Sequence, residues 1–187
     1  MTLNLAVVTT STRPGRKGPL IADWFVKHAS EEGAFEVVPV DLAEVGLPLL
    51  DEPEHPMKGA YTKDHTKRWS ALIDKADAIV FVLPEYNYLP PASFINAVDY
   101  LHREWHYKPV GFVSYAGMSG GSRAVQAAKP LITTLKAMPI PEGVFIPNFF
   151  AHLGESGFTP NEQHISSAKL MIEELAKWTT ALKPLRG

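Results

Sequence analysis

The sequence predicts an α/β domain built on a doubly wound, five-stranded parallel sheet with helices on both faces. Short apolar runs alternate with amphipathic segments along the whole chain, and this alternation is typical of a parallel sheet. The chain has 187 residues, 45% of them hydrophobic, which is enough for one substantial core. We therefore expect a single domain that spans residues 1–187.

The five expected strands are short runs rich in valine, leucine, isoleucine and phenylalanine. They cover residues 5–9, 35–40, 78–83, 110–115 and 144–146. We expect the order 2-1-3-4-5, one of the two common orders of doubly wound sheets. In this order the chain reverses direction between the first and third strands, so the loops that follow them leave a crevice.

Helical patterns lie between these strands, at residues 19–32, 61–75, 91–103 and 123–137, with a last helix from about 161 to 182. Thr159, Pro160, Asn161 and Glu162 provide a start signal for the last helix, because asparagine is a preferred N-cap residue. Residues 46–57 contain three prolines, and we expect them to form a surface connection.

Composition excludes several classes of function. The formal net charge is −2 and the pI is about 6.4, so we expect neither a nucleic acid nor a membrane as partner. The chain has no cysteine, which excludes disulfides and cysteine nucleophiles. It shows neither a signal peptide nor an apolar run of membrane-spanning length, and a cytoplasmic location is the default expectation.

A basic, hydroxyl-rich segment follows the first strand, at residues 9–18 (TTSTRPGRKG). A strand, such a turn and a helix N-terminus together favour anion binding, because backbone N–H groups and the helix dipole face the ligand. We expect a phosphate to be held here by Ser11, Arg13, Arg16, Lys17 and Gly18. The glycine spacings of P-loops and dinucleotide-binding loops are absent. An exposed basic turn with a solubilising role is the competing interpretation.

A second polar loop follows the third strand and consists of Pro84, Glu85, Tyr86, Asn87 and Tyr88. The two tyrosines offer ring faces, and the asparagine offers amide donors and an acceptor for the edge of a heterocycle. Because this loop borders the same crevice as the phosphate loop, a mononucleotide with a flat ring would satisfy both. Simple aromatic packing at the end of a strand is the alternative.

A third segment, residues 114–123, follows the fourth strand and opens a helix. Its three glycines permit close approach of the backbone to a ring, and its N–H groups are suited to hydrogen-bond ring carbonyls. The candidate contact residues are Tyr115, Gly117, Met118, Ser119, Gly120 and Gly121. A mobile glycine loop is the alternative.

The three segments resemble those of the NAD(P)H-dependent FMN reductase family, a flavodoxin-like group that includes bacterial quinone, chromate and azo-compound reductases. The resemblance spans nearly the whole chain. It is most specific in residues 84–88 (PEYNY), followed by Pro91, residues 96–97 (NA) and residues 99–101 (DYL). It implies that FMN is the cofactor and that residues 84–87 line its isoalloxazine ring.

The resemblance also assigns the other two loops. The FMN phosphate would be held by Ser11, Arg13 and residues 16–18, and residues 115–121 would flank the ring and the ribityl chain. The family usually has a glycine where this chain has Thr10, and a second serine where it has Arg16. Arginine can replace the lost hydroxyl with a charged donor.

The activity that the resemblance implies is a ping-pong reductase reaction. NAD(P)H is the co-substrate and reduces the flavin at N5, and a quinone, flavin, azo compound or similar small acceptor then reoxidises it. The flavin supplies the chemistry, so no catalytic protein acid or base is assigned. The rival hypotheses are an FMN electron carrier that serves a protein partner and a flavin-free protein that binds a small phosphorylated ligand.

We expect no metal site, because the seven histidines show no metal-ligand spacing and most of them should lie at the surface. His102 and His106 are four residues apart, but no further ligands accompany them. The resemblance implies a homodimer, or a tetramer, with FMN near the interface. The aromatic residues Phe94, Tyr100 and Trp105 fit either such an interface or ordinary core packing.

Overall fold

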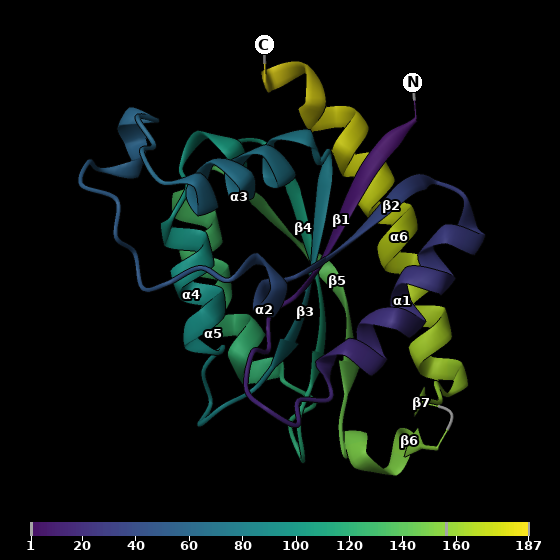
Figure 1. The fold of residues 1–187 in the computed structure, drawn as a ribbon. Helices are drawn as coiled ribbons and strands as arrows, with labels where there is room; N and C mark the ends of the chain where they lie inside the picture. The colour runs from purple at the N-terminus through teal and green to yellow at the C-terminus, as the bar shows by residue number, and fades with distance from the viewer. Residues whose placement is uncertain (1, 156, 187) are drawn as a thin grey trace.

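The computed structural model describes residues 2–155 and 157–186, and it confirms the predicted sheet. Five parallel strands pair in the order β2-β1-β3-β4-β5 (Figure 1). The strands are β1 (Leu3–Thr9), β2 (Phe35–Asp41), β3 (Ala78–Pro84), β4 (Pro109–Tyr115) and β5 (Met138–Ile146). In register, Leu5 of β1 lies beside both Val37 of β2 and Ala78 of β3.

Helices cover both faces of the sheet, as expected. On one face lie α1 (Gly18–Glu32) and α6 (Glu162–Leu182), and on the other lie α3 (Asp64–Lys75), α4 (Ala92–Asp99) and α5 (Ser122–Thr134) (Figure 1). The shorter elements are α2 (Leu42–Val45), the 3₁₀ turns Pro56–Lys58, Arg103–Trp105, Phe149–His152 and Lys183–Arg186, and the hairpin of β6 (Leu153–Gly154) and β7 (Gly157–Phe158).

Some boundaries differ from the prediction. Strand β5 begins at Met138 rather than at residue 144, although it contains Pro139 and Pro141. Strand β5 lies at the edge of the sheet. An edge strand pairs with a neighbour on one side only, so a proline that faces the open side costs no hydrogen bond between strands. The expected helix 91–103 ends at Asp99, and Tyr100 and Leu101 turn into the core.

The core consists of two apolar layers, one on each side of the sheet. Every residue of β3 and β4 is buried, as expected for central strands covered on both faces. Phe94, Tyr100 and Trp105 are fully buried in the layer beneath α3, α4 and α5. The aromatic content of this region therefore belongs to the core and gives no support for a subunit interface.

The expectation that most histidines lie at the surface is wrong, because only His55 is exposed, five histidines are partly buried and His164 is buried. His164 is only 3% exposed and forms a capping box with Asn161 at the start of α6. The His164 N–H donates to Asn161 Oδ1 at 2.9 Å, and the Asn161 N–H donates to His164 Nδ1 at 3.3 Å. The predicted start of this helix is thus confirmed, and a neutral imidazole completes the cap.

Acidification should destabilise the protein through His164. Burial, and then the neighbouring His152 ring with its centroid 4.8 Å away, lower the pKa of His164 below its usual value of about 6.5. The unfolded chain therefore binds the proton more readily, and the free energy of unfolding falls as pH drops below about 6.5. In His164→Gln, which keeps a capping-box acceptor, the fall in urea stability between pH 7 and 5 should be smaller.

Measuring both proteins, the wild type and His164→Gln, at pH 7 as well as at pH 5 separates the cost of the side-chain exchange itself from the loss of stability on acidification. Equal pH curves for His164→Gln and the wild type would show that the capping imidazole does not titrate in this range.

Candidate functional site

The three predicted loops leave the sheet at one edge, where β1, β3 and β4 end side by side (Figure 1). Hydrogen bonds join them directly. The Thr10 N–H and hydroxyl both donate to Val82 O, at 3.1 and 2.9 Å, and the Glu85 N–H donates to Tyr115 O at 3.2 Å. The predicted convergence of these segments is confirmed.

The phosphate loop holds a buried hydroxyl with no partner. Ser11 is fully buried, and its Oγ makes no hydrogen bond of good geometry with the described residues, although the Tyr115 hydroxyl lies close to it. An unsatisfied buried hydroxyl costs stability, about 1–3 kcal/mol, and at the start of a helix such a hydroxyl is well placed to bind an anion. The phosphate that the sequence predicts would supply this atom.

Gly18, the first residue of α1, lies against Ser11. A Cβ at this position would stand 2.3 Å from Ser11 Oγ and 2.8 Å from the Tyr115 hydroxyl, so only glycine fits without displacement. The N-cap residue Lys17 makes no side-chain capping bond. Together, an uncapped helix N-terminus, a free buried hydroxyl and a close backbone approach form a cradle that suits an anion.

The basic side chains of the loop differ in their surroundings. Arg16 Nη1 donates to Asp41 Oδ1 at 2.6 Å and to the Ser11 carbonyl at 2.8 Å, so this guanidinium ties the loop to the end of β2. Arg13 and Lys17 are exposed, and Arg13 donates only to the adjacent Pro14 carbonyl, at 3.3 Å. The exposed cations beside the cradle are therefore Arg13 and Lys17, whereas Arg16 fixes the shape of the loop.

The loop after β3 forms a tight turn at residues 86–89. Tyr86 and Leu89 exchange backbone hydrogen bonds of 2.9 and 3.0 Å, and the two central residues, Asn87 and Tyr88, have φ of +52° and +72°. Asparagine tolerates this left-handed conformation, but a tyrosine is strained in it. Pro84 is buried at the end of β3, and Tyr88 is 63% exposed. The turn therefore presents an aromatic ring to solvent.

The loop after β4 is held from below by Ser114, whose hydroxyl donates to Gly120 O at 2.8 Å. Gly120 and Gly121 both have positive φ, and Gly121 is the N-cap of α5. Gly117 and Met118 lie at the exposed tip, and the Met118 side chain is 93% exposed. Backbone N–H groups and an apolar side chain thus lie on this loop, next to the turn after β3.

Tyr115 connects this loop to the phosphate cradle. Its ring packs edge-on against Phe149 with centroids 5.1 Å apart, and its hydroxyl lies near Ser11 and the backbone of Gly18. Burial raises the pKa of Tyr115 to about 12, so its phenol is neutral and able to donate at physiological pH.

Three side chains that the sequence analysis did not select also hold the loops together. Asp41 pairs with Arg16, Ser93 Oγ donates to Thr10 O at 2.5 Å, and Arg123 binds Glu85. Each pair joins segments at least 25 residues apart, so no local sequence signal marks it.

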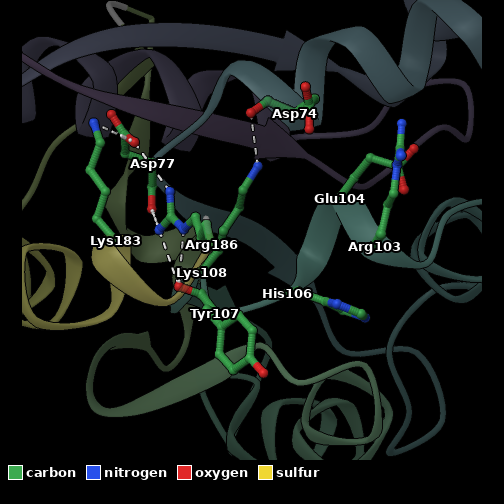
Figure 2. Close-up of a pocket in the computed structure, with 9 residues that line it drawn as sticks. All are labelled: Asp74, Asp77, Arg103, Glu104, His106, Tyr107, Lys108, Lys183 and Arg186. Atoms are coloured by element: carbon green, nitrogen blue, oxygen red, sulfur yellow. Dashed lines mark hydrogen bonds and ion pairs between the residues drawn. The ribbon is translucent and has the colours of Figure 1, made fainter.

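A cavity of about 590 Å³ lies at the opposite end of the strands, where β3 and β4 begin (Figure 2). Several of its charged groups already have partners within the protein. Lys183 and Arg186 both bind Asp77, at 2.9 and 3.1 Å, and Lys108 Nζ caps the end of α3 by donating to the Ile73 and Asp74 carbonyls. These contacts fasten the C-terminal segment and need no ligand.

Within the described residues, no group of three histidine, aspartate or glutamate side chains is arranged to hold a metal ion. None of the helices in the described part of the chain is both long enough and apolar enough to cross a membrane.

Comparison with known proteins decides the family. A family model described as NADPH-dependent FMN reductase matches residues 3–151. The chain belongs to this family. An NAD(P)H-dependent FMN reductase of Schizosaccharomyces pombe is 37% identical over 171 residues, which cover 83% of this chain and 86% of the relative.

A second relative and a solved structure are also similar to this chain. A quinone reductase of Pseudomonas putida is 28% identical over 82% of this chain and 84% of its own length. The solved structure of FerB, an NAD(P)H:acceptor oxidoreductase from Paracoccus denitrificans, superposes with a TM-score of 0.77 at 20% identity, covering 97% of this chain and 99% of FerB. The family is one of oxidoreductase enzymes that use FMN and NAD(P)H, and the flavodoxin-like fold is shared.

Proposed function

We propose that this FMN reductase family member oxidises NAD(P)H and reduces small acceptors such as quinones, flavins or azo compounds, with donor and acceptor binding in turn. The observation that supports this most is the buried, unpartnered Ser11 hydroxyl at the uncapped start of α1. When bound there, FMN would supply the redox chemistry, taking a hydride from NAD(P)H and passing two electrons to the acceptor.

Both buried and exposed groups of the phosphate cradle would contribute to binding. Ser11 Oγ and the first N–H groups of α1 would bind the phosphate, and the exposed Arg13 and Lys17 would add positive charge. Arg16 would act through the loop, because its Nη1 is engaged by Asp41 and by the Ser11 carbonyl.

The other two loops would hold the ring between them. Pro84, Glu85, Tyr86, Asn87 and Tyr88 would border it on one side, and the second side would be formed by Tyr115, Gly117, Met118, Ser119, Gly120 and Gly121. The exposed Tyr88 and Met118 side chains would border the open face, where the donor and then the acceptor would enter.

We also propose that the protein forms a homodimer. Exposed apolar side chains lie on the loop at residues 46–57, where Leu49 is 81% and Met57 66% exposed, and Ile95 of α4 is 37% exposed. The loop at residues 46–57 lies against α4, because the Leu50 N–H donates to Asn96 Oδ1 at 2.9 Å, so Leu49 and Ile95 are candidates for a protein–protein contact. Sedimentation at micromolar concentration should give twice the mass of the chain, and a monomer would contradict the proposal.

The direct test of function is spectroscopic. Purified protein with added FMN should show a bound-flavin absorbance spectrum that bleaches on anaerobic titration with NADPH or NADH, and a quinone should then restore it. A bound flavin that neither nucleotide reduces would indicate an electron carrier instead. Absence of flavin binding would refute the assignment of the loops.

Ser11→Ala separates binding from stability. The substitution removes a buried polar group that is not hydrogen-bonded, and with it the cost of burying that group. The apo-protein should therefore be as stable as the wild type or about 1 kcal/mol more stable. FMN affinity should fall by about 10-fold or more, since a hydrogen bond to a charged group contributes about 1.5–3 kcal/mol. Urea unfolding and fluorescence titration with FMN measure the two effects.

Thr66→Val is the matched control, because Thr66 also carries a buried hydroxyl, close to the Glu52 carboxylate, and lies in α3, away from the cradle. It should leave FMN affinity unchanged. If Ser11→Ala kept wild-type FMN affinity, Ser11 would not be a phosphate ligand.

A further inference from the structure

An ion pair joins the turn after β3 to the loop after β4. Arg123 donates to Glu85 Oε1 from Nε at 2.7 Å and from Nη2 at 2.5 Å, and Ser119 Oγ donates to Glu85 Oε2 at 2.8 Å. The Arg123 guanidinium also lies over the Tyr88 ring, 3.7 Å from its centroid. Arg123, in the first turn of α5, therefore contacts two residues of the segment that the sequence marks as the ring-binding loop.

The turn needs such support because its backbone is strained. Both central residues, Asn87 and Tyr88, have positive φ, and the Tyr88 side chain has no steric reason to favour this conformation. Backbone strain of this kind persists only where surrounding contacts fix it. The cation–π contact of Arg123 restrains Tyr88 from above, and the ion pair restrains Glu85 at the base of the turn.

The position of Arg123 on its helix is also unfavourable by itself. The N-terminal turn of a helix carries partial positive charge, which disfavours a cation there. The Glu85 carboxylate, whose side chain is only 4% exposed, compensates this charge. Burial alone would raise the pKa of Glu85, but hydrogen bonds from Arg123 and Ser119 lower it below its usual value, so the pair is ionised at neutral pH.

These contacts differ from an ordinary surface ion pair, which contributes little. The acceptor is buried, two donors of one guanidinium reach the same oxygen, and a third donor from Ser119 satisfies the other oxygen. The four side chains involved, Glu85, Tyr88, Ser119 and Arg123, connect the turn after β3 to the loop after β4.

We propose that Arg123 is a positioning residue that acts through Glu85 and Tyr88. It holds the turn at residues 86–89 in its left-handed conformation and sets the distance between this turn and residues 116–121. The inference deepens the proposed function and rests on it for the identity of the group that lies between the two loops. The role of Arg123 within the protein itself can be tested without any cofactor.

The first test uses the apo-protein. In Arg123→Met the charge and the donors are lost but an unbranched apolar side chain remains. Hydrogen exchange of the Tyr86 and Leu89 amides, which bond across the turn, should accelerate by about 10-fold or more. Lys129→Met removes a cation from the same helix and should leave both amides as protected as in the wild type. Equal protection in Arg123→Met would overturn the proposal.

The second test uses FMN and the double variant. Arg123→Met should weaken FMN binding by about 10-fold and shift the visible spectrum of the bound flavin, whereas Arg123→Lys should restore part of both. Glu85→Gln combined with Arg123→Met should be no worse than Arg123→Met alone, because the buried charge is removed together with its partner. Independent, additive effects of the two substitutions would contradict action through Glu85.

The two hypotheses fail in different ways. If the wild type bound no FMN, the proposed function would be refuted, and amide exchange would still decide the role of Arg123. The wild type could instead bind FMN and be reduced by NAD(P)H, while Arg123→Met showed the same amide hydrogen exchange, flavin spectrum and FMN affinity as the wild type. That result would refute only the positioning role of Arg123.

Discussion

Gly18→Ala is expected to weaken FMN binding by about 10- to 100-fold while the protein remains folded. The added methyl group would lie 2.3 Å from Ser11 Oγ and 2.8 Å from the Tyr115 hydroxyl, well inside contact distance. Displacing these groups costs about 1–3 kcal/mol, as overpacking does elsewhere, and it moves the hydroxyl that would bind the phosphate. The loss of affinity is measured by titrating the protein with FMN and recording the quenching of flavin fluorescence.

Gly154→Ala is the matched control, because a Cβ at this glycine of the β6–β7 hairpin meets nothing within 4 Å. It should bind FMN like the wild type. A second check is the double variant Ser11→Ala with Gly18→Ala. The closest clash is absent there, so the second substitution should cost less stability than it does alone. Wild-type FMN affinity in Gly18→Ala would show that the cofactor does not occupy this cradle.

The sequence was sufficient to predict the convergence of the three loops, because that convergence depends on strand order alone. Parallel strands place their following loops at one edge of the sheet, and apolar runs locate β1, β3 and β4 to within two residues. The local pattern of strand, turn and helix also selected Ser11 and Gly18 as phosphate-binding residues, whereas the burial of Ser11 and its close approach to Gly18 are findings of the structure.

The partners of the charged side chains could not be predicted in this way. Arg16 suits a phosphate by its chemistry, but Asp41, 25 residues away, engages it at the end of β2. Arg123 stands 38 residues from Glu85, and only the folded sheet brings the two together. Local propensity carries no information on such pairs, since they depend on which loops the sheet order makes neighbours.

Whether an aromatic residue is buried in the core or lies at an interface could not be predicted from the sequence either. Phe94, Tyr100 and Trp105 fit a core or an interface equally well by composition, and burial decides for the core. The exposed apolar side chains that support a dimer, such as Leu49 and Met57, lie instead in the proline-rich connection. Exposure depends on tertiary packing, which residue type alone does not determine.

Gly121→Ala is expected to have the largest effect on stability, lowering the free energy of unfolding by about 2–4 kcal/mol. Gly121 has a φ of +87°, where a side chain costs about 1–2 kcal/mol, and a Cβ would also lie 2.6 Å from the Ser114 Cβ and 3.0 Å from the Tyr115 N. Because these neighbours belong to β4, they cannot move aside as a flexible side chain would. Urea unfolding with the apo-protein measures the effect.

Gly59→Ala isolates the backbone contribution, because Gly59 has a φ of +62° but open space around its Cβ position, far from the three loops. It should cost only about 1 kcal/mol. The difference between the two variants then gives the cost of the contact with β4. That contact is what holds the loop at residues 116–121 close to the sheet edge, so Gly121→Ala should also weaken FMN binding whereas Gly59→Ala should not. Equal stability losses in the two variants would show that backbone strain alone, and no close approach, accounts for glycine at this position.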